Sequence, residues 1–293
     1  MGIRLESVTN GFVAEVTNVD LRQPLDKAIV KEIVQAMDLY GILIFRNQPL
    51  SQQEQVAFGQ QFGPLESTLK NVTKSIQSRL EYDVLTDISN VDTSGKVAGR
   101  EHRQTMMNIG NMLWHSDGSF MNHPFRYSML SAITVVDRGG NTEFADLRAA
   151  YDALDETTKT ELEDVVAEHF AFHSRQMLGF SEVNEDEKKV YPPVRWPLVR
   201  THAGSGRKLL YVGVHAREII GMPLAEGRVF LQELLEHTTQ REFVYRHHWR
   251  VGDLVMWDNR ATIHRGRRFD LSERREMRRV GTVDDVASLP SIA

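Results

Sequence analysis

Short apolar runs separated by turn residues are the feature that most constrains the fold of this chain. Runs rich in β-branched and aromatic residues predict strands within 3–20 and at 42–45, 84–88, 126–136, 142–144, 198–202, 208–214, 243–249, 253–257 and 275–280. Apolar residues at helical spacing predict helices at 24–40, 51–62, 146–154, 157–166 and 225–238. The pattern favours a mainly β fold, either a β-sandwich or a jelly roll, with helices packed outside it.

The length of 293 residues fits one large domain or two ordinary ones. We found no internal repeat, low-complexity segment or linker, so we expect a single domain over 1–293. Within it, residues 66–105 are polar and irregular. A long loop in a compact domain is often functional, which favours a lid over an active site, and a solvated surface loop is the alternative.

Composition excludes several classes of protein. The chain has no cysteine, which rules out disulfides, thiolate metal sites and a cysteine nucleophile. A net charge of -5 argues against a nucleic-acid binder. We see no signal-peptide pattern and no apolar run long enough to span a membrane. We therefore expect a cytoplasmic protein without a membrane span, and we expect it to form a homo-oligomer.

Two stretches carry metal-binding residue types. In Trp114-His115-Ser116-Asp117, which we interpret as a strand end turning into a loop, His115 and Asp117 would point to the same face. The alternative is that Asp117 caps a turn while His115 is a core histidine. His264 follows another apolar strand. Two histidines and one carboxylate form the ligand set of non-haem Fe(II) oxygenases.

A run of arginines follows His264. In a strand over 274–280, Arg275, Met277 and Arg279 would share one face. The other face, which we expect to be solvated, would carry Arg274, Glu276 and Arg278. Buried arginines need anionic partners, so two of them beside a metal would suit two carboxylates. A solvated basic patch, or a patch that binds phosphate or nucleic acid, is the alternative.

These residues carry a family resemblance. His115-x-Asp117, then His264, with Arg275 and Arg279 placed 11 and 15 residues later, resembles the TauD/TfdA family of Fe(II)- and 2-oxoglutarate-dependent dioxygenases. The likeness runs from about Val13 to Asp285 and includes similar stretches at 140–144, 149–154 and 257–260. The stretches 199–208 and 252–260 are most similar to the 2,4-dichlorophenoxyacetate dioxygenase branch.

The resemblance implies a double-stranded β-helix (jelly roll) with iron inside its mouth. It implies that the Fe(II) ligands are His115, Asp117 and His264. Thr142 and Arg275 would hold the distal carboxylate of the cosubstrate 2-oxoglutarate, and O2 would be the second cosubstrate. Arg279 would bind the carboxylate of a small-molecule substrate.

Four further residues match positions near the substrate in that branch. His202 and His215 would lie beside the substrate, although both could equally be structural. Lys70 and Lys96 would lie near the substrate entrance.

The implied reaction hydroxylates an aryloxyalkanoate such as 2,4-dichlorophenoxyacetate next to its ether oxygen. The resulting hemiacetal collapses to a phenol and glyoxylate, while 2-oxoglutarate becomes succinate and CO2. A taurine or alkylsulfonate dioxygenase that releases sulfite is the closest alternative. A metal-binding jelly roll without activity, or a nucleic-acid binder, belongs to a different class and would form no succinate.

Overall fold

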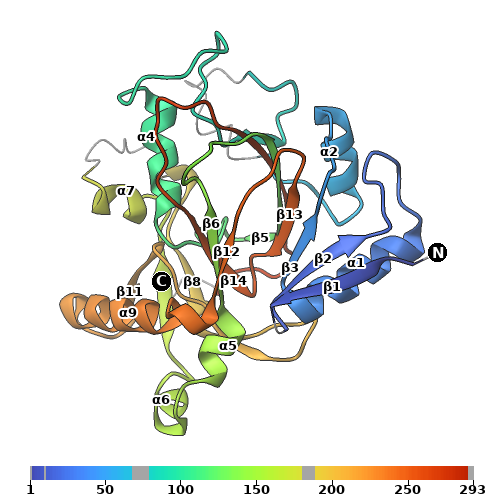
Figure 1. Ribbon diagram of the computed structural model, residues 1–293. Coiled ribbons are helices and arrows are strands. Elements are labelled where there is room, and N and C mark those ends of the chain that lie inside the picture. Colours follow the sequence, from blue (N-terminus) through green and yellow to red (C-terminus); the bar gives the residue numbers. More distant parts are fainter. Residues whose placement is uncertain (1, 10, 68–78, 180–188, 290–293) are drawn as a thin grey trace.

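The computed structural model describes residues 2–9, 11–67, 79–179 and 189–289, and a seven-stranded sheet forms its centre (Figure 1). All neighbouring strands in this sheet are antiparallel except the pair β2 and β3. Its order is β1 (Arg4–Thr9), β2 (Val13–Thr17), β3 (Ile42–Phe45), β13 (Leu254–Asp258), β5 (Phe125–Thr134), β15 (Glu276–Val283) and β4 (Leu85–Asp87).

A smaller antiparallel sheet faces it. Its order is β12 (Val244–His247), β6 (Thr142–Asp146) and β14 (Thr262–Gly266). The chain alternates between the two sheets, since β12 and β14 belong to the small one while β13 and β15 belong to the large one. This alternation is that of a double-stranded β-helix, so the expected jelly roll is confirmed. Between the sheets, Leu130, Val255, Trp257 and Met277 of the large sheet pack with Phe144 of the small sheet.

Two helices cover the outer face of the large sheet. Helix α1 (Lys27–Tyr40) buries Ile33 and Met37 and ends at Gly41, whose positive φ of 86° accompanies an N–H bond to the Met37 carbonyl. Helix α2 (Gln52–Gln60) begins with a capping box between Ser51 and Glu54. Both helices therefore begin and end close to where the sequence predicted.

The chain between β6 and β12 forms the outer part of the molecule (Figure 1). Helix α9 (Leu224–Thr238) belongs to this segment and packs against the rest of it through Leu231 and Leu234. The segment contains two small sheets and four helices in its described residues: β11 (Ala216–Ile219), β7 (Val166–His169) and β8 (Val194–Pro197); β9 (Val199–Thr201) and β10 (Lys208–Leu210); α5 (Leu147–Asp152), α6 (Glu156–Glu161), α7 (His173–Met177) and α9 (Leu224–Thr238).

The structure corrects several expected elements. The helix expected at 157–166 ends at Glu161, and Val166 begins strand β7. Before the first metal-binding stretch, the structure has helix α4 (Arg103–Ile109) and the 3-10 turn η1 (Gly110–Met112) instead of a strand. His115 forms only an isolated bridge with His264. Strands β8 and β11 and helix α7 were also not predicted.

Two of the three residues expected on a solvated face, Glu276 and Arg278, are buried, whereas Arg274 is exposed as expected. Arg278 lies beneath α2, where it donates to the Gln55 side chain and to the Leu50 carbonyl, both at 2.7 Å. Glu276 is also buried and pairs with Arg79 and Arg274. Glu276 and Arg278, which the sequence pattern placed in solvent, thus find their hydrogen-bond and ion-pair partners inside the fold. In the described part of the chain, no helix is both long and apolar enough to cross a membrane.

Candidate active site

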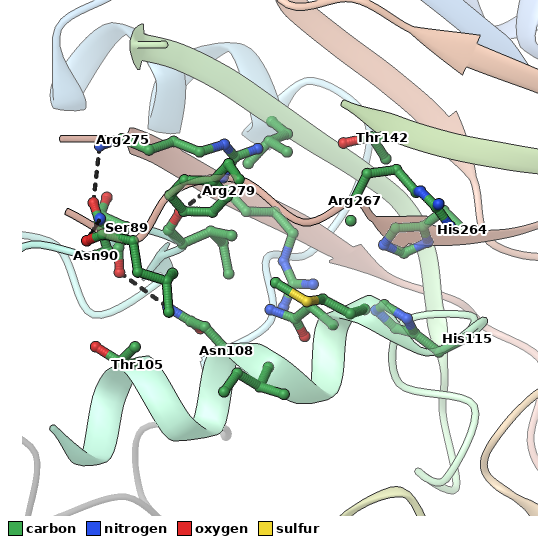
Figure 2. A pocket seen from close by; sticks show the side chains of 18 of the residues that line it. Ser89, Asn90, Thr105, Asn108, His115, Thr142, His264, Arg267, Arg275 and Arg279 are labelled. Atoms are coloured by element: carbon green, nitrogen blue, oxygen red, sulfur yellow. Dashed lines mark hydrogen bonds between the residues drawn. The ribbon is translucent and has the colours of Figure 1, made fainter. Parts of the chain in front are cut away.

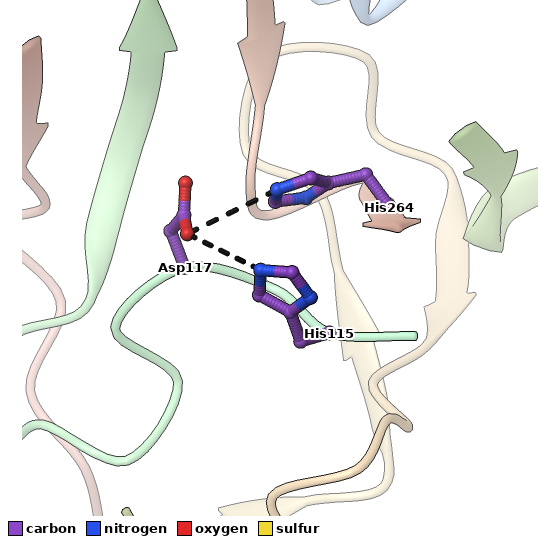
Figure 3. A group of neighbouring side chains, drawn as sticks. All are labelled: His115, Asp117 and His264. Atoms are coloured by element: carbon purple, nitrogen blue, oxygen red, sulfur yellow. Dashed lines mark ion pairs between the residues drawn. The ribbon is translucent and has the colours of Figure 1, made fainter. Parts of the chain in front are cut away.

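The isolated bridge between His115 and His264 brings three candidate ligands together (Figure 3). The Nε2 atoms of His115 and His264 lie 3.7 and 4.0 Å from Oδ1 of Asp117. All three side chains are buried, and their ligand atoms lie within 4.8 Å of one another. We call His115, Asp117 and His264 the triad.

Both histidines of the triad are held as neutral rings. His115 Nδ1 lies 2.7 Å from the Leu113 carbonyl and must donate to it, so Nε2 keeps its lone pair. The ring of His264 stacks on Phe144 and lies 4.7 Å from the Trp257 ring. Burial is the main reason why the pKa of each histidine is lowered. Neutral imidazole is the form that binds metals.

Asp117 is held as a carboxylate. Burial acts to raise its pKa, but the charge of Arg279 and the hydrogen bond from Ser128 act to lower it, and the pKa lies well below its usual range. Arg279 donates to Oδ1, while the Ser128 hydroxyl donates to Oδ2 at 2.6 Å. Two neutral nitrogens and one charged oxygen at this spacing can hold a divalent metal ion.

An open cavity lies beside the triad (Figure 2). The two triad histidines form one end of it, and Thr142, Arg275 and Arg279 lie along its walls. The remaining lining combines polar and apolar side chains from α4, the β4 side and the segment before β15, among them Asn90, Asn108, Ile109, Phe269 and Leu271. The cavity can therefore hold both anions and an apolar group.

Arg275 is a buried cation without a counter-charge among the described residues. Its guanidinium donates to the Gly140 carbonyl at 3.2 Å and to the Ile88 carbonyl at 3.4 Å, and it lies 5.5 Å from the centre of the Phe269 ring. No described carboxylate forms an ion pair with it. Burial lowers its pKa to about 10, so it stays charged at neutral pH. Thr142 Oγ1 accepts from Trp249 at 3.0 Å, which leaves the hydroxyl hydrogen free to donate.

Arg279 lies between the triad and the cavity. It donates to Asp117 through one terminal nitrogen, while its Nε is buried and has no hydrogen-bond partner among the described residues. Its guanidinium also lies 5.3 Å from the centre of the Phe125 ring. The alternation of side chains in the expected strand over 274–280 thus placed both Arg275 and Arg279 on the side that lines the cavity.

The other expected substrate contacts that lie in the described residues do not line this cavity. His202 is buried, with Nε2 at 3.1 Å from Asp258 and Nδ1 against Ser205, and its role beside the substrate stays a prediction. His215 packs edge-on to the His115 ring at 6.4 Å, and its role in substrate binding stays a prediction. Lys96 is exposed, and Lys70 lies outside the described residues.

Sequence reasoning missed two polar residues around Asp117. Ser128 and Asn259 are both buried and bonded to each other at 2.9 Å. Asn259 belonged to a stretch that matched the family, but it received no role. Helix α4 was missed as well, although Thr105, Asn108 and Ile109 form one wall of the cavity.

A jelly roll with a buried pair of histidines, one carboxylate and two arginines around a cavity defines a metal-dependent oxygenase. The model of the family described as "Taurine catabolism dioxygenase TauD, TfdA family" matches residues 4–280. The chain belongs to this family.

Individual relatives agree with this assignment. The chain is 56% identical over 274 residues to the alpha-ketoglutarate-dependent 2,4-dichlorophenoxyacetate dioxygenase of Cupriavidus pinatubonensis, covering 94% of this chain and 95% of the relative. It is 36% identical over 291 residues to the (S)-phenoxypropionate/alpha-ketoglutarate-dioxygenase of Sphingobium herbicidovorans, covering 96% and 95%. The crystal structure of AAD-2 with Mn(II) and N-oxalylglycine superposes with a TM-score of 0.95 at 46% identity, covering 99% and 100%. The chain is a 2-oxoglutarate-dependent dioxygenase.

Proposed function

We propose that this enzyme hydroxylates an aryloxyalkanoate, such as 2,4-dichlorophenoxyacetate, next to its ether oxygen. The observation that carries the proposal is the pair of buried arginines, Arg275 and Arg279, in one cavity beside the triad. Each suits one carboxylate, and the reaction needs two: one on 2-oxoglutarate and one on the substrate. Relatives named for this substrate class support the choice of an aryl ether.

His115, Asp117 and His264 would hold Fe(II), for which their neutral nitrogens and charged oxygen are suitable. Bound iron would activate O2 while 2-oxoglutarate is converted to succinate and CO2. The role of the protein is to present the ligand atoms in a buried, preorganised site, so that cosubstrate and substrate meet in one orientation.

Arg275 and Thr142 would bind the distal carboxylate of 2-oxoglutarate. Arg275 offers the charge, which no described carboxylate neutralises. Thr142 offers its hydroxyl hydrogen from β6 of the small sheet, and its oxygen is already fixed by Trp249. A charged donor and a hydroxyl that line the same cavity favour an anion that can accept from both.

Arg279 would bind the substrate carboxylate. Its unpaired Nε is the buried donor that such a carboxylate could satisfy. The aromatic ring would then lie against apolar lining residues such as Ile109, Phe269 and Leu271. Holding the carboxylate and the aromatic ring of the substrate fixes the position of the carbon between the carboxylate and the ether oxygen. Hydroxylation at this carbon gives a hemiacetal that breaks down to a phenol and glyoxylate.

Product analysis tests the proposal. Purified protein is incubated with Fe(II), 2-oxoglutarate, O2 and either 2,4-dichlorophenoxyacetate or taurine. We expect equal amounts of succinate and 2,4-dichlorophenol from the first mixture. Sulfite release from taurine, with no phenol from the aryl ether, would instead favour an alkylsulfonate dioxygenase.

We further infer that residues 1–293 form one domain, in which the 66–105 region acts as a lid. Its described part supplies Ile88, Ser89, Asn90 and Thr105 to the cavity lining, which supports this role. Limited proteolysis with and without N-oxalylglycine tests the lid, because a closing lid should become protected when this 2-oxoglutarate analogue binds.

The absence of cysteine is compatible with a reducing cytoplasm.

A further inference from the structure

Asp117 is held by a cycle of hydrogen bonds that begins and ends on the residue itself. Its backbone N–H donates to Asn259 Oδ1 at 3.1 Å. Asn259 Nδ2 donates to Ser128 Oγ at 2.9 Å, and Ser128 donates to Asp117 Oδ2 at 2.6 Å. All three residues are at most 5% exposed. The cycle therefore fixes the backbone and the carboxylate of Asp117 together.

The direction of these bonds is set by a fourth residue. Trp257 Nε1 donates to Asn259 Oδ1 at 3.0 Å, so this oxygen accepts two N–H groups. Indole nitrogen and backbone nitrogen can only donate, which fixes the amide with Nδ2 towards Ser128. The Ser128 oxygen then accepts from Asn259, and its single hydrogen remains for Asp117.

The backbone of the β13–β14 turn holds Asn259 in place. The Asn259 N–H donates to the Arg126 carbonyl at 2.9 Å, and the Ser116 hydroxyl donates to the Asn259 carbonyl at 2.6 Å. On the other side of the turn, Arg260 and His202 bind the Asp258 carboxylate. The asparagine is therefore anchored independently of Asp117.

We propose that Ser128 and Asn259 are positioning residues that leave Asp117 with one oxygen for the metal. Carboxylates can bind metals through one or both oxygens. Here Oδ2 is taken by Ser128. Oδ1 also accepts a hydrogen bond, from Arg279, but it is the oxygen nearest to the Nε2 atoms of His115 and His264. A carboxylate oxygen has two lone pairs, so one of them remains for a metal ion. A one-oxygen contact leaves more of the metal free for 2-oxoglutarate and O2. This inference rests on the proposed function.

Metal titration tests the inference without turnover. The variant Ser128→Ala removes a single oxygen and keeps the strand intact. Free Mn(II) is measured by electron paramagnetic resonance as the metal is added to wild type and variant. We expect the Mn(II) dissociation constant to rise roughly 10-fold, and up to about 100-fold for Asn259→Ala. At saturating Mn(II), we also expect N-oxalylglycine to bind Ser128→Ala more weakly, because Oδ2 becomes free to compete with it.

Thr262→Val is the matched control. Thr262 Oγ1 donates to the Asp258 carbonyl at 2.9 Å in the same turn and is fully buried, but it forms no part of the cycle. Its loss should lower the melting temperature and leave Mn(II) affinity at the wild-type value. Equal Mn(II) affinity of Ser128→Ala and wild type would overturn this inference alone, as would an equal loss in Thr262→Val. A wild-type protein that binds no Mn(II) would overturn the proposed function as well.

Discussion

Two clusters in the described chain place histidine and carboxylate atoms within reach of one metal ion. One is the triad. The other, which we call the closed cluster, consists of Asp38, His202 and Asp258. In the closed cluster, Arg260 donates to Asp258 at 2.6 Å and lies 3.8 Å from Asp38. An arginine side chain thus balances the carboxylate charge in both clusters, because Arg279 donates to Asp117 in the triad.

The difference lies in which atoms remain free. In the closed cluster, His202 has both ring nitrogens engaged, and none of its three members lines the cavity. In the triad, the Nε2 atoms of His115 and His264 face a single carboxylate oxygen, and both rings line the cavity. Residue types and proximity are therefore insufficient to define a metal site. Free donor atoms at an accessible cavity are also required.

The largest expected effect is the loss of activity on changing a triad residue. Asp117→Ala removes the only carboxylate of the triad, so succinate formation and Mn(II) binding should both fall below detection. Asp38→Asn in the closed cluster is the control, and it should retain both. If Asp38→Asn also lost Mn(II) binding, the contrast between the two clusters would be wrong.

The second effect separates the two arginines of the cavity. Arg275→Ala should raise the KM for 2-oxoglutarate by about 10- to 150-fold, since a charge-assisted bond to a buried anion contributes about 1.5–3 kcal/mol. Arg279→Ala should raise the KM for the aryloxyalkanoate instead. Steady-state kinetics with each substrate varied in turn measures both values. An Arg279→Ala enzyme with a normal KM for the aryl ether would refute the substrate clamp.

Much of the jelly roll could be predicted from the sequence because its strands are apolar runs between turns. Ile42–Phe45 and Leu254–Asp258 were found for this reason. Strand β7 was missed because its apolar residues continued the helical spacing of the preceding helix. Helix α4 was missed because Arg103–Ile109 carries no clear apolar face.

Tertiary contacts explain what the sequence could not show at the site. His202 has no free ring nitrogen partly because Asp258 binds its Nε2, and Asp258 lies 56 residues away in the chain. The buried face of β15 depends on α2, whose Gln55 satisfies Arg278. In contrast, Arg275 and Arg279 could be predicted because strand alternation is a local property.

A reciprocal pair of variants sharpens the contrast between the clusters. His202→Ala removes a partner of a buried carboxylate and should lower the free energy of unfolding by about 1–3 kcal/mol, with Mn(II) affinity unchanged within about twofold. His264→Ala should do the opposite, losing Mn(II) affinity while the metal-free protein keeps its stability. Urea unfolding and Mn(II) titration of both proteins give the four values. A loss of Mn(II) affinity in His202→Ala would show that the closed cluster supports the triad.

The smallest expected effect concerns a histidine that belongs to neither cluster. His169 is buried against Tyr211, and both of its ring nitrogens lack a partner in the described part of the chain. Burial lowers its pKa to about 3. The unfolded chain, with a histidine pKa of about 6.5, therefore binds a proton that the folded chain does not, and stability falls as the pH drops through 6.5 towards 3.

His169→Phe keeps a ring in that place and removes the titration. Lowering the pH from 7 to 5.5 should then cost the variant about 1 kcal/mol less stability than wild type, because one such group contributes about 1.4 kcal/mol per pH unit. Urea unfolding of both metal-free proteins at the two pH values measures the difference. Equal losses would mean that His169 takes up its proton in the folded state, as a histidine with a carboxylate partner would.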